Sequence, residues 1–348
     1  MTMRMATSQD TGFTLLCRSS GLDEGLLPPF RARFPWLGAH LQTARNNLVL
    51  PRGPGREFER KDLVLPLRAA ALGKLTGRLE RPATQRPVGS IVMLHGLGGE
   101  IDSTYMRLAA RFFLERGYRV LRLNMRGAAT SAQYCQTHYH AGLTSDIEDV
   151  IGALPGEVRR QGLYLVGFSL GANIILKLFG EASPVLDQIR AGLVVSAPLD
   201  LSRSLRVIDR PGNWIYRRYL VAKLRQTHRL VGPRIAGRPA QLGAIAGIRD
   251  YDEAVVAPMH GFRDAADYYA KCSGKKFIPG IRTPLLMVHA ANDPWVPAPI
   301  YRDQVWPQNG AITAILTDDG GHMGFHAAGS SYPWYLRAAA PFFAAQAE

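Results

Sequence analysis

Short apolar runs alternate with helical segments along most of this chain, and this alternation limits the possible folds more than any other feature. Residues 90–94, 118–124, 163–168 and 192–196 are runs of this kind, and segments with helical patterning separate them. Strands joined by helices form βαβ units, and such units build a mostly parallel sheet with helices on both faces. The sequence therefore predicts an α/β fold.

The first region, residues 1–55, does not share this rhythm. Five prolines interrupt it, so we expect an irregular N-terminal arm rather than regular structure. Apolar side chains within the arm predict that it packs on the core; they are Phe30, Phe34, Trp36 and Leu41.

The predicted core is split by an insertion. It comprises residues 56–199 and 281–348. Between the run at 192–196 and the next apolar run at 285–290, roughly 80 residues intervene, and structureless connections of that length are uncommon in compact domains. Residues 200–280 are therefore predicted to form a helical cap.

The cap carries much of the net charge. The chain has 42 Lys and Arg against 28 Asp and Glu, a net charge of +14, and residues 201–240 alone hold ten basic residues against Asp209. This basic stretch predicts either steering of anionic substrates, docking on an anionic lipid surface, or simply a solvated face. We expect no nucleic-acid binding, because no known nucleic-acid-binding motif accompanies the charge. The aromatic and aliphatic residues 214–216, 219 and 220 either line an apolar pocket or pack the cap on the body.

Other features bear on compartment and cofactors. No apolar run is long enough to span a bilayer and no leader peptide is evident, so we expect a cytoplasmic protein, with peripheral membrane association as an alternative. The three cysteines are widely spaced and indicate no disulfide framework. No glycine-rich phosphate loop or metal-ligand spacing occurs, so no cofactor and no metal are expected. The oligomeric state is left open.

The chemistry centres on one motif. Gly167-Phe168-Ser169-Leu170-Gly171 has the form G-x-S-x-G, and it directly follows an apolar run and directly precedes a helix. A nucleophilic serine on a sharp strand-to-helix turn needs this context, because side chains at the glycines would clash. Ser169 is the predicted nucleophile.

A serine hydroxyl needs a base, and the base needs an acid that fixes its tautomer. His322, on a glycine-rich loop after the last apolar run, is the predicted base, with His326 as its nearest rival. Asp293, immediately after the run at 285–290, is the predicted acid, and Asp200 is the alternative.

Backbone N–H groups must stabilise the oxyanion that forms during acyl transfer. After such an elbow they come from the residue that follows the serine and from the loop after an earlier strand. Here these are Leu170 and Leu97, the latter within the glycine-rich residues 95–99.

Several motifs in order resemble the α/β-hydrolase superfamily, and within it the YheT-like hydrolases related to mammalian abhydrolase-domain lipases. The motifs are His40-Leu41-Gln42-Thr43, His95-Gly96-Leu97, Asn124-x-Arg126-Gly127, Tyr139-His140-Ala141-Gly142, the Ser169 elbow, Ala257-Pro258-x-His260-Gly261-Phe262, Asp267-Tyr268-Tyr269 and Gly320-Gly321-His322-x-Gly324-Phe325. The resemblance implies the same nucleophile, acid and base, and a substrate that is a short-chain ester or an acylglycerol or other lipid ester. Ala128, Ala129 and Ala172 depart from the usual glycines.

Two further functions remain open at this point. An acyltransferase would use the same acyl-enzyme and pass the acyl group to an acceptor other than water. A non-catalytic binding protein would keep only the fold, because fold alone does not establish activity.

Overall fold

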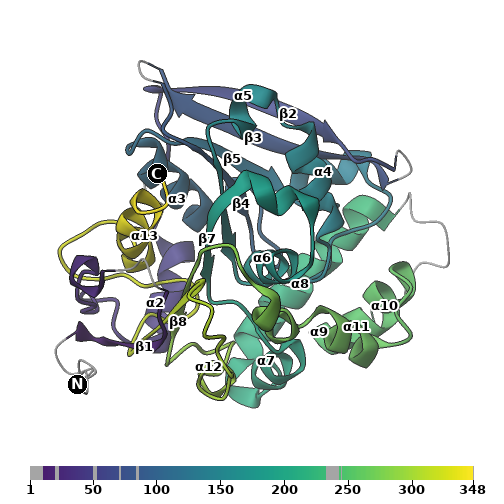
Figure 1. Cartoon of the computed structure of the whole chain (residues 1–348). Helices are drawn as coiled ribbons and strands as arrows, with labels where there is room; N and C mark the ends of the chain where they lie inside the picture. Colours follow the sequence, from purple (N-terminus) through teal and green to yellow (C-terminus); the bar gives the residue numbers. More distant parts are fainter. Residues whose placement is uncertain are drawn as a thin grey trace.

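A twisted nine-stranded sheet runs through the part of the chain that the computed structural model describes, namely residues 11–19, 23–49, 53–69, 72–83, 86–232, 243 and 245–347. The strand order is β1-β9-β8-β7-β6-β4-β5-β3-β2 (Figure 1). The strands are β1 (Phe13–Cys17), β2 (Phe58–Pro66), β3 (Lys74–Pro82), β4 (Ser90–Leu94), β5 (Arg119–Asn124), β6 (Leu163–Phe168), β7 (Ile189–Val195), β8 (Leu285–Ala290) and β9 (Ile312–Thr317).

The middle of the sheet is parallel. Strands β5, β4, β6, β7, β8 and β9 pair in parallel in that order, whereas β3, β2 and β1 join in antiparallel fashion at the two edges. Apart from Arg190 in β7, the parallel strands are continuously buried, as expected for strands covered on both faces. The predicted α/β fold is confirmed.

Helices cover both faces of the sheet. On one face lie α3 (Thr104–Leu114) and α13 (Trp334–Ala344), and on the other lie α4 (Ser145–Ala153), α5 (Gly156–Arg159) and α6 (Leu170–Gly180) (Figure 1). Successive side chains of a strand point to opposite faces. In β6, Leu165 accordingly packs in the core beneath α4 and α6, and Val166 packs beneath α3 and α13.

The N-terminal arm is more regular than predicted. Its strand β1 pairs antiparallel with β9, and α2 (Gly38–Leu48) is an eleven-residue helix. Phe30 is buried as expected, but Phe34 is 81% exposed and Leu41 is also exposed, so these two do not anchor the arm. The prediction of an irregular segment was wrong at β1 and α2.

The segment between β7 and β8 is helical where it is described. Its helices are α7 (Leu201–Ile208), α8 (Trp214–Val231), α9 (Ile248–Tyr251), α10 (Ala257–Met259) and α11 (Ala265–Cys272), and a π-helical turn spans Asp252–Val256. A short helix α12 (Pro299–Arg302) follows β8. The division into arm, core and cap stays a prediction.

The five large side chains at the start of α8 divide three ways. Leu220 lines a cavity, and Tyr216 packs against Trp295 with ring centroids 5.4 Å apart. The remaining three, residues 214, 215 and 219, are exposed, so for them neither predicted alternative holds.

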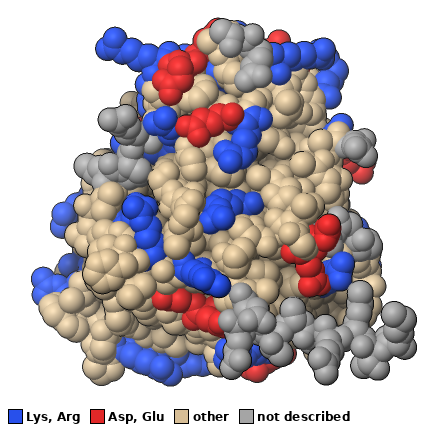
Figure 2. Space-filling model, turned by 90° about the vertical axis from the view of Figure 1, so that its left-hand side faces the viewer, with Lys and Arg blue, Asp and Glu red and all other residues tan. Residues whose placement is uncertain are grey.

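Positive charge is not confined to this segment. On the face shown in Figure 2, Lys and Arg side chains are spread over the surface and Asp and Glu are fewer. Two of the ten basic residues counted within 201–240, Arg234 and Arg238, lie outside the described residues.

Candidate active site

Ser169 sits on the sharp turn between β6 and α6. Its backbone adopts φ +51°, a conformation that is rare for residues with a side chain and that recurs at functional sites. The flanking glycines are required sterically, because a Cβ at Gly167 would lie 2.7 Å from Gly171 O, and a Cβ at Gly171 would lie 2.5 Å from His95 O. The strained turn therefore depends on small residues on both sides of the serine.

The three residues predicted to act together come into contact. His322 Nε2 lies 2.9 Å from Ser169 Oγ, and His322 Nδ1 lies 2.8 Å from Asp293 Oδ2. All three side chains are buried. They come from the elbow after β6, the loop after β8 and the loop after β9, so the topology of the parallel sheet brings them to one edge.

Asp293 is held as an anion. Trp295 N and Val296 N donate to its Oδ1 at 2.8 and 3.0 Å. Burial alone would raise the pKa of Asp293, but His322 and these hydrogen bonds bring it below its usual value. The Trp295 ring also stacks on His322, with centroids 4.2 Å apart, and so fixes the plane of the imidazole.

The two rival candidates lie elsewhere. His326 contacts the arm, because its backbone N–H donates to Gln42 Oε1, and burial lowers its pKa to about 3. Asp200 caps α7 by accepting from Arg203 N at 2.9 Å and pairs with Lys275. Neither contacts Ser169, and Asp200 does not contact His322, among the hydrogen bonds of the described residues.

Helix α2 holds the loop that carries His322. Thr43 Oγ1 accepts from His322 N at 2.8 Å, and Asn46 Nδ2 donates to Met323 O at 2.9 Å. The backbones approach so closely that a Cβ at Gly321 would lie 2.4 Å from Ala39 O. In the sequence, the His40–Thr43 motif indicates only a resemblance, and no local pattern predicts this contact.

The loop after β4 offers one unused backbone donor beside Ser169. Gly96 N and Gly98 N donate to the hydroxyls of Tyr105 and Tyr139, whereas Leu97 N makes no hydrogen bond within the described part of the chain. A Cβ at Gly96 would lie 3.2 Å from Ser169 Cβ, so the loop passes directly over the serine. Leu170 N is at the first position of α6, where a helix leaves N–H groups without an intrahelical acceptor.

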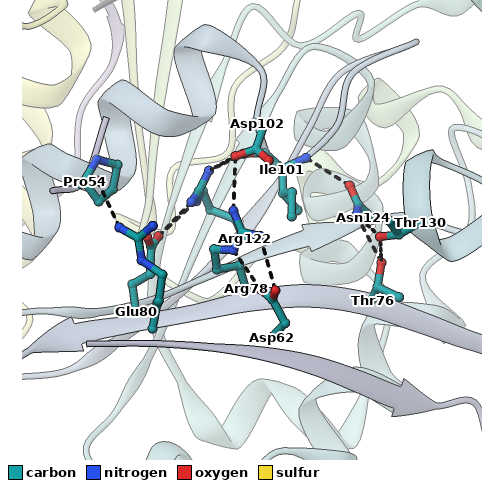
Figure 3. A network of polar contacts seen from close by, with 11 residues as sticks. Pro54, Asp62, Thr76, Arg78, Glu80, Ile101, Asp102, Arg122, Asn124 and Thr130 are labelled. Carbon is teal, nitrogen blue, oxygen red and sulfur yellow. Dashed lines mark hydrogen bonds and ion pairs between the residues drawn. The ribbon is translucent and has the colours of Figure 1, made fainter. Parts of the chain in front are cut away.

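A buried polar network fastens the end of this loop to the sheet (Figure 3). Arg122 on β5 pairs with Glu80 on β3 at 2.9 Å and donates to the carbonyl of Ile101 and to Asp102. Asn124 Oδ1 accepts from Ile101 N at 2.9 Å, and its amide donates to the hydroxyls of two threonines, Thr76 and Thr130. Both the N–H and the carbonyl group of Ile101 are thus held by side chains of β5.

His95 fixes the start of the same loop. Its Nε2 accepts from Met125 N at 3.1 Å, so Nδ1 carries the proton and donates to Gly96 O at 2.8 Å. Burial lowers the pKa of His95 to about 4, which keeps the imidazole neutral and this pair of bonds intact near neutral pH.

Comparison with known proteins is consistent with this geometry. A protein-family model described as "Alpha/beta hydrolase family" matches residues 91–331, which is most of the chain. The chain belongs to this family. Among solved structures, acylaminoacyl peptidase from Pyrococcus horikoshii shares the fold with a TM-score of 0.53 at 15% identity, covering 83% of this chain and 41% of that one.

Curated relatives of this α/β-hydrolase include three ester-cleaving proteins by name. "Putative esterase YheT" of Escherichia coli is 30% identical over 71% of this chain and 73% of its own length. Monoacylglycerol lipase of Saccharomyces cerevisiae is 31% identical over 70% of this chain and 56% of its own length. Phospholipase ABHD3 of Bos taurus is 25% identical over 70% of this chain and 59% of its own length. The predicted resemblance to YheT-like hydrolases is confirmed, although the chain spans little more than half of the lipase and the phospholipase.

An apolar cavity opens from Ser169 and His322 into the helices of residues 201–269. Leu97 and Leu170 line it near the serine. Its farther wall is mostly aliphatic and aromatic, with Leu201, Leu205, Ile208, Leu220, Leu224, Ile248, Tyr251, Val256, Tyr268 and Tyr269. A cavity of this character accommodates an apolar group beside Ser169. Sequence reasoning did not single out Asp252, the carboxylate in this wall, because nothing in its local pattern marks it as buried.

Two further observations concern ligands and membranes. No group of three or more His, Cys, Asp or Glu in the described residues is arranged to hold a metal ion. None of the helices in the described ranges has both the length and the apolar character needed to cross a bilayer.

Proposed function

We propose that this protein hydrolyses carboxylic esters through an acyl-enzyme on Ser169. The observation that carries the proposal is the continuous chain of contacts from Ser169 Oγ through His322 to Asp293, at 2.9 and 2.8 Å. Each member has the environment that its role requires: a serine on a strained elbow, a buried imidazole and an anionic carboxylate. The esterase, lipase and phospholipase names of the relatives support the same reaction class.

The reaction follows from these positions. Ser169 Oγ attacks the ester carbonyl carbon while its proton passes to His322 Nε2, and Asp293 stabilises the imidazolium. The carbonyl oxygen becomes an oxyanion, which accepts hydrogen bonds from Leu97 N and Leu170 N. Collapse of this intermediate breaks the bond to the alcohol, which leaves with the proton from His322. Water then attacks the acyl-enzyme by the same route and releases the acid and the free serine.

The test compares ester hydrolysis by the wild-type protein with that of Ser169→Ala, over p-nitrophenyl esters of increasing acyl length. We expect the variant to lose turnover by a factor on the order of 10⁶, because residues that act as a unit lose most of their effect together. Ser331→Ala, at an exposed serine, is the matched control. Undiminished hydrolysis by Ser169→Ala would refute the proposal.

The same assay separates hydrolysis from acyl transfer. With a labelled ester and added alcohol, amine or thiol, hydrolysis yields the free acid, whereas transfer yields the acylated acceptor. Acylated product in excess of free acid would assign the acyl-enzyme to a transferase.

We further propose that α8 docks on an anionic lipid surface that presents the substrate. The exposed residues Trp214, Ile215 and Tyr219 lie close in sequence to basic residues, and the Arg218 guanidinium lies 5.8 Å from the centre of the Trp214 ring. Apolar side chains beside cations suit the boundary of an anionic membrane. The same helix lines the cavity through Leu220, so a lipid bound at its outer face would lie close to the cavity.

Sedimentation with vesicles tests this docking. We expect binding to phosphatidylcholine vesicles to rise when phosphatidylglycerol is added, and the double variant Trp214→Ala/Ile215→Ala to bind several-fold less. Val305→Ala, another exposed apolar site, is the control outside α8. Equal binding of both vesicle types, or full binding by the double variant, would remove the membrane from the proposal.

A further inference from the structure

A carboxyl group stands in the wall of the otherwise apolar cavity. Asp252 lines the same cavity as Ser169 and His322, and it is only 7% exposed. It belongs to the segment between β7 and β8, and not to the loops that carry Ser169 and His322. It begins the π-helical turn Asp252–Val256, and single π-turns of this kind occur frequently at functional sites. The proposed mechanism gives this carboxyl group no task.

The carboxyl group is only partly satisfied by the protein. Tyr269 donates its hydroxyl proton to Asp252 Oδ2 at 2.7 Å, and among the described residues no group hydrogen-bonds Oδ1. The two other tyrosines on this wall are engaged elsewhere. Tyr251 hydrogen-bonds His138 Nε2 at 2.8 Å, and Tyr268 accepts from Ala141 N at 2.9 Å. One oxygen of Asp252 therefore remains available to whatever fills the cavity.

Oδ1 is not among the fully enclosed polar atoms that lack a partner, so it keeps some accessible surface where Asp252 lines the cavity, and a group that fills the cavity would have to supply a hydrogen bond to it. Burial also raises the pKa of Asp252 to about 7, so near neutral pH the group is protonated in a large fraction of molecules. A protonated carboxyl group both donates and accepts, and so does a hydroxyl group. Among the described residues that line the cavity there is no Lys or Arg to fix a charged ligand; apart from His140, Ser204, Ser169 and His322, the members other than Asp252 are aliphatic and aromatic.

We propose that Asp252 is a specificity-determining residue that hydrogen-bonds a hydroxyl group of the ester substrate. The hydroxyl lies either on the acyl chain or on the alcohol part, and it meets the unused carboxyl oxygen when the carbonyl is at Ser169. A substrate without the hydroxyl leaves that oxygen unpaired, and sites built to bind a hydroxyl discriminate against such analogues. This inference rests on the proposed ester hydrolysis.

Matched pairs of substrates test the inference on the wild-type protein. In one arm, p-nitrophenyl esters of hydroxyalkanoic acids, with the hydroxyl at successive positions, are compared with the unsubstituted esters of equal length. In the other arm, a 1-monoacylglycerol is compared with the propyl ester of the same acid. We expect kcat/KM to favour the hydroxylated member by at least about tenfold in one arm, the value of one hydrogen bond to a buried partner. The substrate pair that shows this preference identifies whether the acyl chain or the alcohol part bears the hydroxyl.

Two variants assign the preference to Asp252. In Asp252→Leu the polar partner is replaced by an apolar side chain of similar size, and we expect the ratio of kcat/KM values to fall to near one. In Asp252→Asn the hydrogen-bonding capacity is kept, and we expect most of the preference to remain. Because the readout is a ratio, a general loss of activity cancels. If Asp252→Leu does not fold, Asp252→Ala carries the same expectation.

The outcomes separate this inference from the function on which it rests. Wild-type hydrolysis that is equally fast for both members of both pairs overturns the role of Asp252 and leaves the esterase intact. A preference for the hydroxylated substrate that persists in Asp252→Leu also overturns the role of Asp252 and leaves the proposed esterase intact. If the wild-type protein cleaves none of these esters, the proposed function itself fails.

Discussion

The two loops that meet over Ser169 are held by opposite means. The loop after β4, which carries Leu97, is fixed from within the sheet by buried charges and amides, above all Arg122 and Asn124 (Figure 3). The loop after β9, which carries His322, is fixed from outside by close backbone contact with α2. One loop thus depends on buried charged and amide groups of the sheet, and the other on hydrogen bonds and close backbone approach from a neighbouring helix.

The difference teaches which kinds of change each loop should tolerate. A buried ion pair loses much when one partner is removed and little when both are replaced by apolar residues. A backbone contact responds to added volume, whatever the charge. Substitutions at the two loops should therefore differ in kind as well as in size.

The largest effect is expected at the loop after β4. Arg122→Met leaves Glu80, which is 1% exposed, as an unpaired buried carboxylate, and should lower the free energy of unfolding by about 3–5 kcal/mol. Chemical denaturation measures this loss.

A double variant separates stability from positioning. Glu80→Leu/Arg122→Met removes both charges, so this double variant should be nearly as stable as the wild-type protein. Its kcat should nevertheless be below the wild-type value, as in Arg122→Met, because Ile101 O has lost its donor in both variants. If kcat recovers together with stability, the network does not position the loop.

The next largest effect is expected at the loop after β9. Gly321→Ala introduces a Cβ 2.4 Å from Ala39 O at a residue with φ +57°, and should lower the free energy of unfolding by about 2–4 kcal/mol. Activity should fall as well, since the shift displaces His322.

Gly329→Ala is the matched control for that collision. Gly329 has a similar φ of +76°, but nothing lies within 4 Å of its added Cβ. Its cost should be limited to backbone strain, about 1–2 kcal/mol. Equal losses in the two variants would contradict the steric account of the loop.

The smallest change in the free energy of unfolding is expected for each unit by which the pH is lowered, and it involves histidines of both loops. His95 in the first loop and His326 in the second have pKa values lowered by burial to about 4 and about 3. The unfolded chain binds protons at these sites first, so their contribution to stability is present above about pH 6.5 and is lost as pH falls toward 4 and below.

Each of these histidines should contribute a slope of about 1.4 kcal/mol per pH unit within that window. Denaturation curves at pH 7, 6, 5 and 4.5 measure the slope. The slope is taken as the difference between the wild-type protein and His95→Gln/His326→Gln, because His138, His260, His289 and Asp252 also have shifted pKa values that act in this pH range. Equal slopes in the two proteins would show that these two imidazoles are not buried in the neutral form.

The sequence was sufficient for the features that follow a regular pattern. Buried parallel strands are continuous apolar runs, so β4, β6 and β8 were predictable, as was the elbow at Ser169 between a strand and a helix. The contact of Ser169, His322 and Asp293 was expected because the carboxyl ends of parallel strands meet at one edge of the sheet.

Helix α2 could not be predicted in this way, for a physical reason. The face that it buries is polar, with Gln42, Thr43, Arg45 and Asn46, because it binds the backbone of the His322 loop instead of an apolar core. Hydrophobic periodicity is therefore missing although the helix is well packed. Strand β1 is only five residues long and joins the sheet through a partner about 300 residues away in sequence, so no local pattern marks it.

That distant pairing has a consequence for how the protein is made. During synthesis, β1 leaves the ribosome long before β9 has been made. His322 follows a few residues after the end of β9. The pairing of β1 with β9 can form only after nearly all of the described chain has been translated. Contacts between such remote segments form slowly, and the contacts of β1 with β9 and of α2 with the loop that follows β9 cannot form before these residues have been made. The nascent chain therefore contains Ser169 well before it contains His322, the residue that Ser169 contacts in the folded protein.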